Sequence, residues 1–338
     1  TASIAKGVTR QFTATATLSD ATTQDVTNDA VWTATDVTGT GVTSINTSGL
    51  ATGAAVGTAT VTATYAGFSS NATLTVTTAV PMSITITPAP LNIPLNMVVQ
   101  LTATLVYSDS TTVNVTASGV WDSADPTIAT VTGTGATGGR ARGVAAGTAT
   151  LRVVANGITG TITANVSPCH VTINEVQVAG VVSASDEFIE LYNGCSFAVN
   201  LNDNVRIFYR ASAGTSDTGL FTFPASTNLA PGGFRLYVGS AYSGAATRDG
   251  TLTNGLSGTG GGVALIYLAS YLGRASDLIV DSLGYGDAEG SWSFAAPVAP
   301  GLAADNPPAL GPAGTAHMSL ADYGLWLQAI LKGGAGWL

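Results

Sequence analysis

The chain has 338 residues, only 9% of which are charged, and its formal net charge is −9. The 11 basic residues are too few and too scattered to neutralise a phosphate backbone, and no stretch is apolar for long enough to cross a bilayer, so nucleic acid and membrane insertion are excluded as expected partners. The 41 glycines and the many threonines of the first half favour strands over helices, and the length predicts two or three domains.

A repeat of about 90 residues occupies the first half of the chain. The stretch QFTATATLSDATTQDVT at 11–27 matches QLTATLVYSDSTTVNVT at 100–116, and GTATVTATYAG at 57–67 matches GTATLRVVANG at 147–157. Apolar and polar residues alternate within these stretches, which predicts strands with one buried face. The period is too long for a solenoid unit and is typical of a small β-sandwich.

Trp32 and Trp121 lie at equivalent positions of this repeat, and we expect both of them in a core. With the matched stretches, they make residues 1–78 and 82–167 resemble the bacterial immunoglobulin-like group 2 family. The resemblance implies two small Greek-key sandwiches that serve as spacer or adhesion modules on exported proteins. It does not name a ligand, because one fold carries many functions.

The first repeat starts later in the pattern than the second. The second opens with MSITITPAP at 82–90, a predicted first strand, whereas the first opens with TASIAKG at 1–7, which matches the segment after such a strand. The domain at 1–78 is therefore expected to lack its first strand. Either the chain was cut from a longer array, or another chain fills the open edge.

The composition changes at Pro168, which marks a third domain, predicted at 168–320. Its motifs include INEV at 173–176, EFIELYN at 187–193 and IVDSLGYG at 279–286. In this order they resemble the lamin tail domain of bacterial exported proteins, which implies a further immunoglobulin-like sandwich. The expected fold is thus all-β, with three consecutive immunoglobulin-like β-sandwich domains in a rod-like array.

Three of the chain's four glutamates lie close together in this third domain. Within EFIELYN, Glu187 and Glu190 point to opposite faces of the strand, so they cannot converge on one bond as a hydrolytic pair. Glu175 could still meet one of them across strands, which leaves that alternative open. The lamin tail resemblance instead implies that Asn174, Glu175, Glu187 and Glu190 are structural. We therefore assign no catalytic residue and expect no enzyme activity.

Two cysteines, Cys169 and Cys195, are too few for a closed zinc site and too far apart for a redox motif. A disulfide is the simplest interpretation and implies an oxidising, exported setting, whereas in a reducing compartment both would be free thiols. His170 would make a third zinc ligand, but no fourth is evident, so we expect no metal and no cofactor. We interpret the acids of the first repeat as solvated turn residues rather than calcium ligands: Asp20, Asp25, Asp29 and Asp36.

The last segment, 321–338, is apolar and glycine-rich and lies outside the lamin tail resemblance. Leaving its large side chains in water would forgo the free energy of burying apolar surface. The segment is expected either to fold back onto its own domain or to dock on another copy, for which the domain at 1–78 is the natural acceptor. The predicted assembly or binding residues are Tyr323, Leu325, Trp326, Leu327, Ile330, Leu331 and Trp337.

Three functional hypotheses follow. The preferred one is a non-enzymatic extracellular structural protein, a subunit of a surface filament, sheath or layer built by head-to-tail contacts with other copies of itself. The second is an adhesin that recognises a glycan or a cell-surface protein. The third is the non-catalytic end of a longer exported enzyme, because lamin tail domains often accompany nucleases or phosphatases. All three place the chain outside the cell or on its surface.

Overall fold

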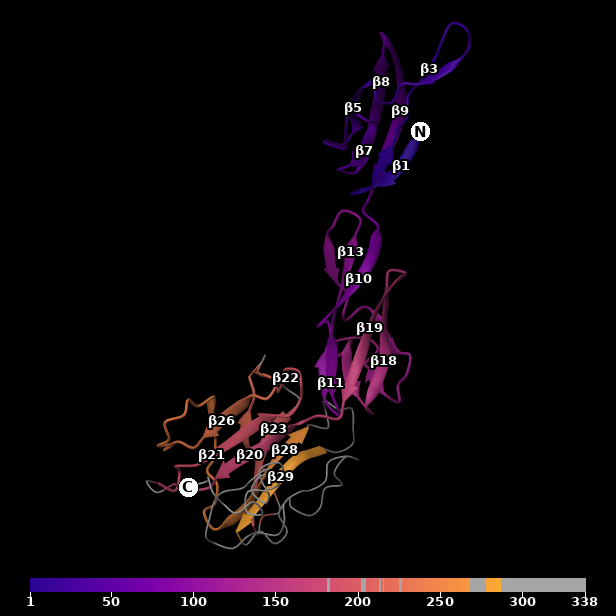
Figure 1. Cartoon of the computed structure of the whole chain (residues 1–338). Coiled ribbons are helices and arrows are strands. Elements are labelled where there is room, and N and C mark those ends of the chain that lie inside the picture. The colour runs from indigo at the N-terminus through magenta and orange to yellow at the C-terminus, as the bar shows by residue number, and fades with distance from the viewer. Residues whose placement is uncertain are drawn as a thin grey trace, which may run out of the picture.

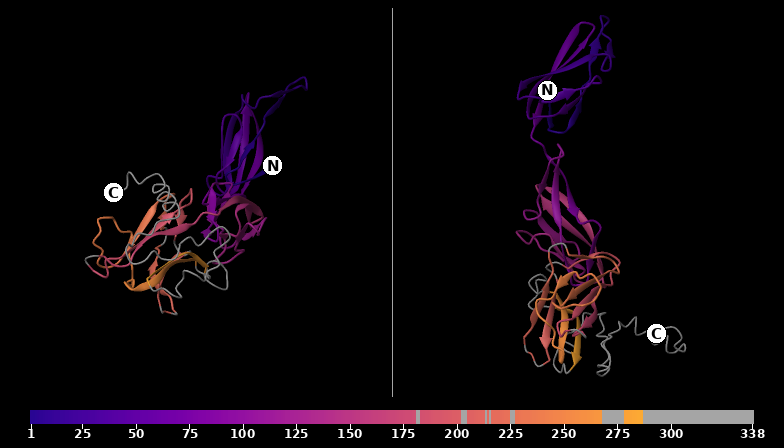
Figure 2. Two further views of the ribbon diagram at one scale, coloured as in Figure 1. Left: turned by 60° about the horizontal axis from the view of Figure 1, so that its bottom comes forward. Right: turned by 90° about the vertical axis from the view of Figure 1, so that its left-hand side faces the viewer.

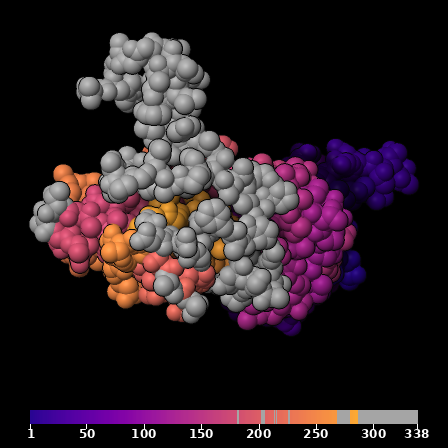
Figure 3. Space-filling view, turned by 90° about the horizontal axis from the view of Figure 1, so that it is seen from below, coloured from indigo at the N-terminus to yellow at the C-terminus, as the bar shows by residue number. Residues whose placement is uncertain are grey.

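The computed structural model describes residues 1–180, 183–201, 205–212, 214, 216–224, 227–267 and 278–286. Every regular element within these ranges is a strand, which confirms the expected all-β class. The strands form three successive units, here called module 1 (1–78), module 2 (79–167) and module 3 (168–286), as Figure 1 shows. Module 2 lies between the other two, both in the two further ribbon views (Figure 2) and in the space-filling view (Figure 3).

Module 1 contains a four-stranded sheet in the order β1-β9-β8-β5, a three-stranded sheet β2-β7-β6 and the hairpin β3-β4. Strand β1 runs parallel to β9, and the other pairs are antiparallel. Alternation places Val61 on the buried face of β8, and Leu74 and Val76 on the buried face of β9. The strands are β1 (Ala2–Ala5), β2 (Thr9–Gln11), β3 (Thr15–Thr17), β4 (Thr23–Asp25), β5 (Val31–Thr38), β6 (Thr43–Ile45), β7 (Leu50–Gly53), β8 (Gly57–Tyr65) and β9 (Phe68–Thr77).

Module 2 repeats this topology and adds one strand, β10. Its sheets are β11-β19-β18-β15, β12-β17-β16 and β10-β13-β14, and β11 again runs parallel to the last strand, β19. Strand β10 is antiparallel to β13 and has no counterpart in module 1. The strands are β10 (Pro81–Thr87), β11 (Leu91–Pro94), β12 (Val98–Gln100), β13 (Thr102–Tyr107), β14 (Thr112–Asn114), β15 (Val120–Ser123), β16 (Ala129–Val131), β17 (Arg140–Gly143), β18 (Gly147–Ala155) and β19 (Ile158–Ser167).

The two modules also share side-chain contacts at equivalent positions. In module 1 the indole Nε1 of Trp32 donates to the carbonyl oxygen of Thr27 at 2.8 Å, and in module 2 Trp121 Nε1 donates to the Thr116 carbonyl at 2.9 Å. The bond satisfies the indole N–H in both modules. The hydroxyl of each threonine also accepts a backbone amide, from Ala14 in module 1 and from Ala103 in module 2, which explains why the threonine recurs with the tryptophan. The sequence repeat therefore corresponds to a structural repeat.

Module 3 contains two four-stranded sheets, β20-β21-β26-β27 and β24-β23-β28-β29, and the short pair β22-β25. Its hydrophobic core includes Phe223, Tyr237 and Tyr267, each at most 1% exposed. The strands are β20 (Val171–Gln177), β21 (Phe188–Asn193), β22 (Val199–Asn200), β23 (Val205–Ala211), β24 (Thr218–Thr222), β25 (Asn228–Leu229), β26 (Phe234–Val238), β27 (Gly250–Thr251), β28 (Gly260–Tyr267) and β29 (Leu278–Gly286).

Candidate functional site

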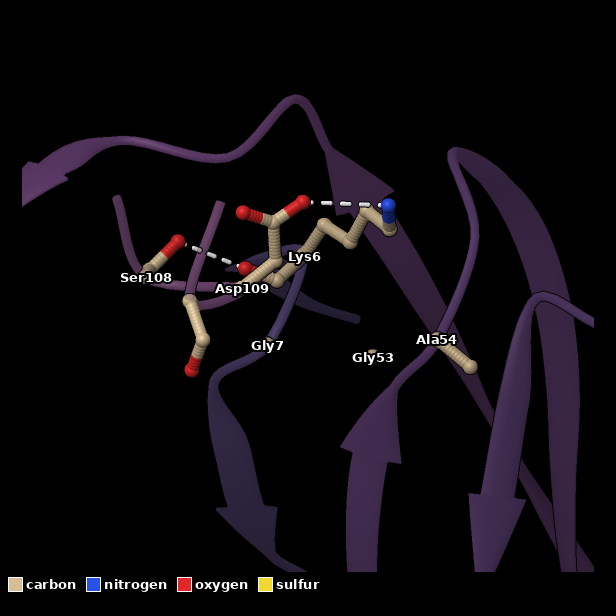
Figure 4. Close-up of a pocket in the computed structure, with 7 residues that line it drawn as sticks. Lys6, Gly7, Gly53, Ala54, Ser108 and Asp109 are labelled. Carbon is tan, nitrogen blue, oxygen red and sulfur yellow. Dashed lines mark hydrogen bonds and ion pairs between the residues drawn. The ribbon is translucent and has the colours of Figure 1, made fainter. Parts of the chain in front are cut away.

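The junction between modules 1 and 2 is built from a turn of one and a hairpin tip of the other. The turn follows β1 and contains Lys6 and Gly7, and the tip follows β13 and contains Ser108 and Asp109. Ser108 Oγ donates to the Lys6 carbonyl oxygen at 2.6 Å, and Lys6 Nζ lies 3.0 Å from Asp109 Oδ2 (Figure 4). A hydrogen bond to the backbone and an ion pair thus link the two modules.

The backbone at this junction leaves room only for glycine at position 7. Gly7 has a φ of 86°, and a Cβ atom there would lie 2.1 Å from the Ser108 carbonyl oxygen. Ser108 also holds the linker between the modules, because its amide donates to the Val80 carbonyl at 2.9 Å and its Oγ accepts from the Val80 amide at 3.1 Å. One serine therefore fixes both the turn of module 1 and the start of module 2.

The charge at this junction is stable over a wide pH range. The hydroxyl of Thr111 and then the ammonium of Lys6 lower the pKa of Asp109 from its usual 3.8 to about 2. Because this folded-state pKa is depressed, the contact is complete above pH 3.8 and is lost only as the pH falls through about 2.

We expect the orientation of module 1 relative to module 2 to be unchanged between pH 4 and pH 8, and to vary more widely in a Lys6→Ala variant at every pH. Small-angle X-ray scattering of the full chain across this range, at constant ionic strength, measures both effects. The matched control is Thr33→Ala, a change at an exposed position of β5 in module 1, which should leave the orientation of the modules unchanged. A transition near pH 4 in the unmodified chain would contradict the assignment.

The junction between modules 2 and 3 uses the same position of the repeat but different chemistry. Asn96, at the position equivalent to Gly7, also has a positive φ, of 66°. The next residues, Met97 and Val98, are 1% and 6% exposed and belong to the hydrophobic cluster of module 3, together with Val171. Module 2 thus places apolar side chains in the core of its neighbour, whereas module 1 uses a salt bridge and hydrogen bonds.

A disulfide joins Cys169 and Cys195, with their Cα atoms 5.0 Å apart, which confirms the simplest interpretation of the two cysteines. It ties the segment that enters β20 to the turn that follows β21, where the Gly194 amide donates to the His170 carbonyl at 3.2 Å. Both sulfurs are bonded to each other and so are not zinc ligands. Within the described ranges, no group of three or more His, Cys, Asp or Glu side chains is arranged to hold a metal ion.

The glutamates of module 3 occupy three different environments. Glu187 is 1% exposed, and its Oε2 accepts the Leu256 amide at 2.7 Å. Burial raises the pKa of Glu187, and the hydrogen bond from Leu256 partly opposes that increase. Glu190 lies on the opposite face of β21, as expected, and its Oε1 accepts the side-chain amide of Asn174 at 2.7 Å. These contacts support a structural role for both acids.

Glu175 is exposed and is paired across the strands with Glu190. The pairing arises because an irregularity at Asn174 shifts the register between Ile173 and Glu175 by one residue. Glu190 is bonded to Asn174, so this cross-strand pair does not present two free carboxylates. The arrangement offers no acid and base converging on a common point, and we assign it no chemistry.

Asp281 on β29 contacts the same strand, β20, from the other sheet. Its Oδ2 accepts the Ile173 amide at 2.7 Å, and its Oδ1 accepts the amide of Ser282 at 2.9 Å. The carboxylate therefore joins the two sheets of module 3 and satisfies the backbone amide of Ile173 on β20, which is an edge strand of its sheet. Burial raises the pKa of Asp281 from 3.8 to about 6, against the lowering effect of these two hydrogen bonds.

The raised pKa of Asp281 predicts an unusual pH dependence. Because the folded state binds this proton more tightly than the unfolded state, its contribution to the stability of module 3 is greatest below pH 3.8 and declines until the pH exceeds about 6, by roughly 2–3 kcal/mol. Urea unfolding at pH 4 and pH 7.5 measures the loss, and Asp281→Asn, which cannot ionise, is expected to remove it. An identical pH dependence in both proteins would contradict the prediction.

The remaining candidate residues fall into two groups. Asp20 and Asp25 accept the amides of Thr22 and Thr27, two residues further on, which is the bonding of turn acids. The tail at 321–338, with its predicted interface residues, lies outside the described residues. Among the described residues, no helix has the length and the apolar character needed to cross a bilayer.

Sequence reasoning missed Lys6, Met97 and Asp281, although the shared turn position of the two repeats was a usable signal for the first two.

The fold and the junctions define a class: an array of β-sandwich modules in which each module contacts the next. The model of the family described as bacterial Ig-like domain (group 2) matches residues 81–166, which lie in module 2. Over 148 residues the chain is 44% identical to Ice-binding protein 1 of Shewanella frigidimarina (strain NCIMB 400). This match covers 44% of the chain but only 16% of that relative.

Similar solved structures include the S-layer protein rSbsC, at 15% identity over 74% of this chain and 32% of that one, with a TM-score of 0.28. They also include the insect immune protein hemolin, at 12% identity over 49% of this chain and 44% of that one, with a TM-score of 0.26. These TM-scores are too low to describe how the present modules are arranged.

Proposed function

We propose that the chain is a non-catalytic extracellular protein whose modules act as a spacer, holding what is attached at one end at a distance from the other. The observation that carries this proposal is the pair of junctions. The turn after β1 of module 1 contacts module 2, and the turn after β11 of module 2 contacts module 3. Ordered contacts at successive junctions are what a spacer of defined length requires, because a flexible linker would let the modules collapse onto one another.

The disulfide supports export, since such bonds persist in oxidising compartments. We further propose that module 1 is a second group 2 immunoglobulin-like domain, because it repeats the topology and the tryptophan contact of module 2. The lamin tail identity of module 3 remains our proposal on the basis of its motifs. We also propose that the 148 residues shared with the ice-binding relative serve as a spacer in this chain.

Small-angle X-ray scattering of the full chain tests the spacer role. A compact chain of this length has a radius of gyration of about 20 Å, and we expect a clearly larger value with the profile of an elongated particle. A value near that of a compact chain would contradict the proposal. Light scattering of the same samples establishes whether the particle is a monomer.

A second candidate is the filament, sheath or layer subunit, which the unpaired edge of module 1 favours. Concentration-dependent fibres or sheets in negative-stain electron microscopy would support self-assembly through head-to-tail contacts. Uniform single particles at all concentrations would exclude self-assembly and favour the spacer role. An array of immobilised glycans and surface proteins would then test whether module 3 acts in adhesion.

A further inference from the structure

Module 1 has an unpaired strand edge at the position that β10 fills in module 2. Strand β13 pairs on one side with β14 and on the other with β10, whereas β3, its counterpart, pairs only with β4. In module 2 the aliphatic residues Ile84 and Ile86 of β10 lie opposite Leu105 and Ala103. Nothing in the described part of the chain occupies this position beside β3, and in Figure 1 the β3 hairpin extends away from the body of module 1.

The core of module 1 is correspondingly incomplete. Phe68 is 82% exposed and Leu18 is 47% exposed, although their counterparts in module 2 are only partly exposed. Trp32 is half-buried, whereas Trp121 is 3% exposed. Large apolar side chains that are covered in module 2 but exposed to water in module 1 indicate that a covering strand is missing from module 1.

A second feature at the same end of module 1 points to the same kind of partner. The tip that follows β3 contains Ser19 and Asp20, which match the Ser108 and Asp109 that receive the lysine turn in module 2. Asp20 bonds to Thr22 as Asp109 bonds to Thr111, but among the described residues Asp20 forms no salt bridge. Module 1 therefore has both acceptor elements of a module junction with neither of them used.

We propose that the β3 edge is a strand-binding site for a strand equivalent to β10, supplied by a further module of this kind. The occupant is an extended segment with the chemistry of β10, in which aliphatic residues alternate with serine or threonine and a proline follows. It pairs antiparallel to β3 and covers Ala14 and Ala16, the counterparts of Ala103 and Leu105. Backbone hydrogen bonds provide affinity at such an edge, and the alternate side chains provide specificity.

The structure also sets a limit on the sequence of this strand. In module 2 the side chain of Ile84 lies against Gly160, where a Cβ atom would come within 2.8 Å of Ile84 Cγ2. Module 1 has Ser70 at the equivalent position, so an isoleucine there would collide with its Cβ atom. The strand that binds module 1 must therefore carry a small residue at the position equivalent to Ile84.

Two synthetic peptides test the proposal on the full chain: PMSITITPAP, from residues 81–90, and the same peptide with Ile84→Ala. We expect the alanine peptide to bind with saturation at one per chain and to slow amide hydrogen exchange in Thr15–Thr17. The unmodified peptide should bind at least about tenfold more weakly. The Ser70→Gly chain should reverse much of this difference, and a peptide with Ile86→Asp, which places a charge over the core, should not bind.

Three results would overturn the proposal. They are failure of both peptides to bind either chain, binding that leaves the exchange of β3 unchanged, and protection of β3 that rises with chain concentration in the absence of peptide. The last would identify a second copy of the chain as the occupant. The spacer role is tested separately, because the scattering measurement does not depend on this edge.

Discussion

Replacing Trp121 by alanine is expected to lower the free energy of unfolding of module 2 by about 3–5 kcal/mol. The side chain is 3% exposed, its indole bonds to the Thr116 carbonyl, and the turn at Gly139 lies directly against its ring. Removing it leaves a cavity and an unpaired carbonyl, which are two separate costs. Amide hydrogen exchange in module 2, recorded as the temperature is raised, measures the loss of stability in that module separately from the other two.

The equivalent Trp32→Ala change is the matched control and should cost module 1 distinctly less. Trp32 makes the same hydrogen bond, but it is half-buried, so less apolar surface returns to water. Equal losses in the two modules would contradict the view that module 1 lacks a covering strand. Binding of the alanine peptide should bring the two costs closer together.

Removal of the disulfide by the double change Cys169→Ser and Cys195→Ser is expected to destabilise module 3 by about 3–4 kcal/mol, on the loop-entropy argument. The bond closes a loop of 26 residues between the entry of β20 and the turn after β21. Modules 1 and 2 should unfold as before, because the bond lies wholly within module 3. Urea unfolding of the oxidised protein, the reduced protein and the double variant measures the effect.

The two altered forms should unfold alike, since both lack the same cross-link. A variant as stable as the oxidised protein would show that contacts around Met97 and Val171 hold the entry segment without the disulfide. Loss of cooperative unfolding in modules 1 or 2 would show that the bond acts beyond module 3.

Local patterns in the sequence predicted the features that depend on nearby residues. Alternation predicted that Glu187, just before β21, and Glu190, within it, point in opposite directions. The repeat predicted equivalent positions for Trp32 and Trp121, which form matching hydrogen bonds, but only Trp121 is fully buried in a core. The disulfide was the simplest interpretation of the number and spacing of the cysteines, and the structure contains it. These inferences succeed because a strand fixes the direction of each side chain relative to its neighbours.

Features that join distant segments could not be predicted in this way. The register shift at Asn174 brings Glu175 opposite Glu190, and Asp281, more than a hundred residues away, accepts the amide of Ile173 beside that shift. Lys6 comes just before the positive-φ residue of its turn and Met97 just after that of the equivalent turn, and one forms a salt bridge whereas the other is buried. The partner of each was decided by the module that follows, which no local pattern encodes.

We propose that the junctions hold the modules end to end in one arrangement. Spin labels on cysteines introduced at Thr33 and Thr150, exposed positions on β5 and β18, allow the distance between modules 1 and 2 to be measured by pulsed electron paramagnetic resonance. The native cysteines do not interfere, because both are in the disulfide. We predict one narrow distance distribution that broadens in the Lys6→Ala variant, whereas an equally broad distribution in both proteins would contradict an ordered junction.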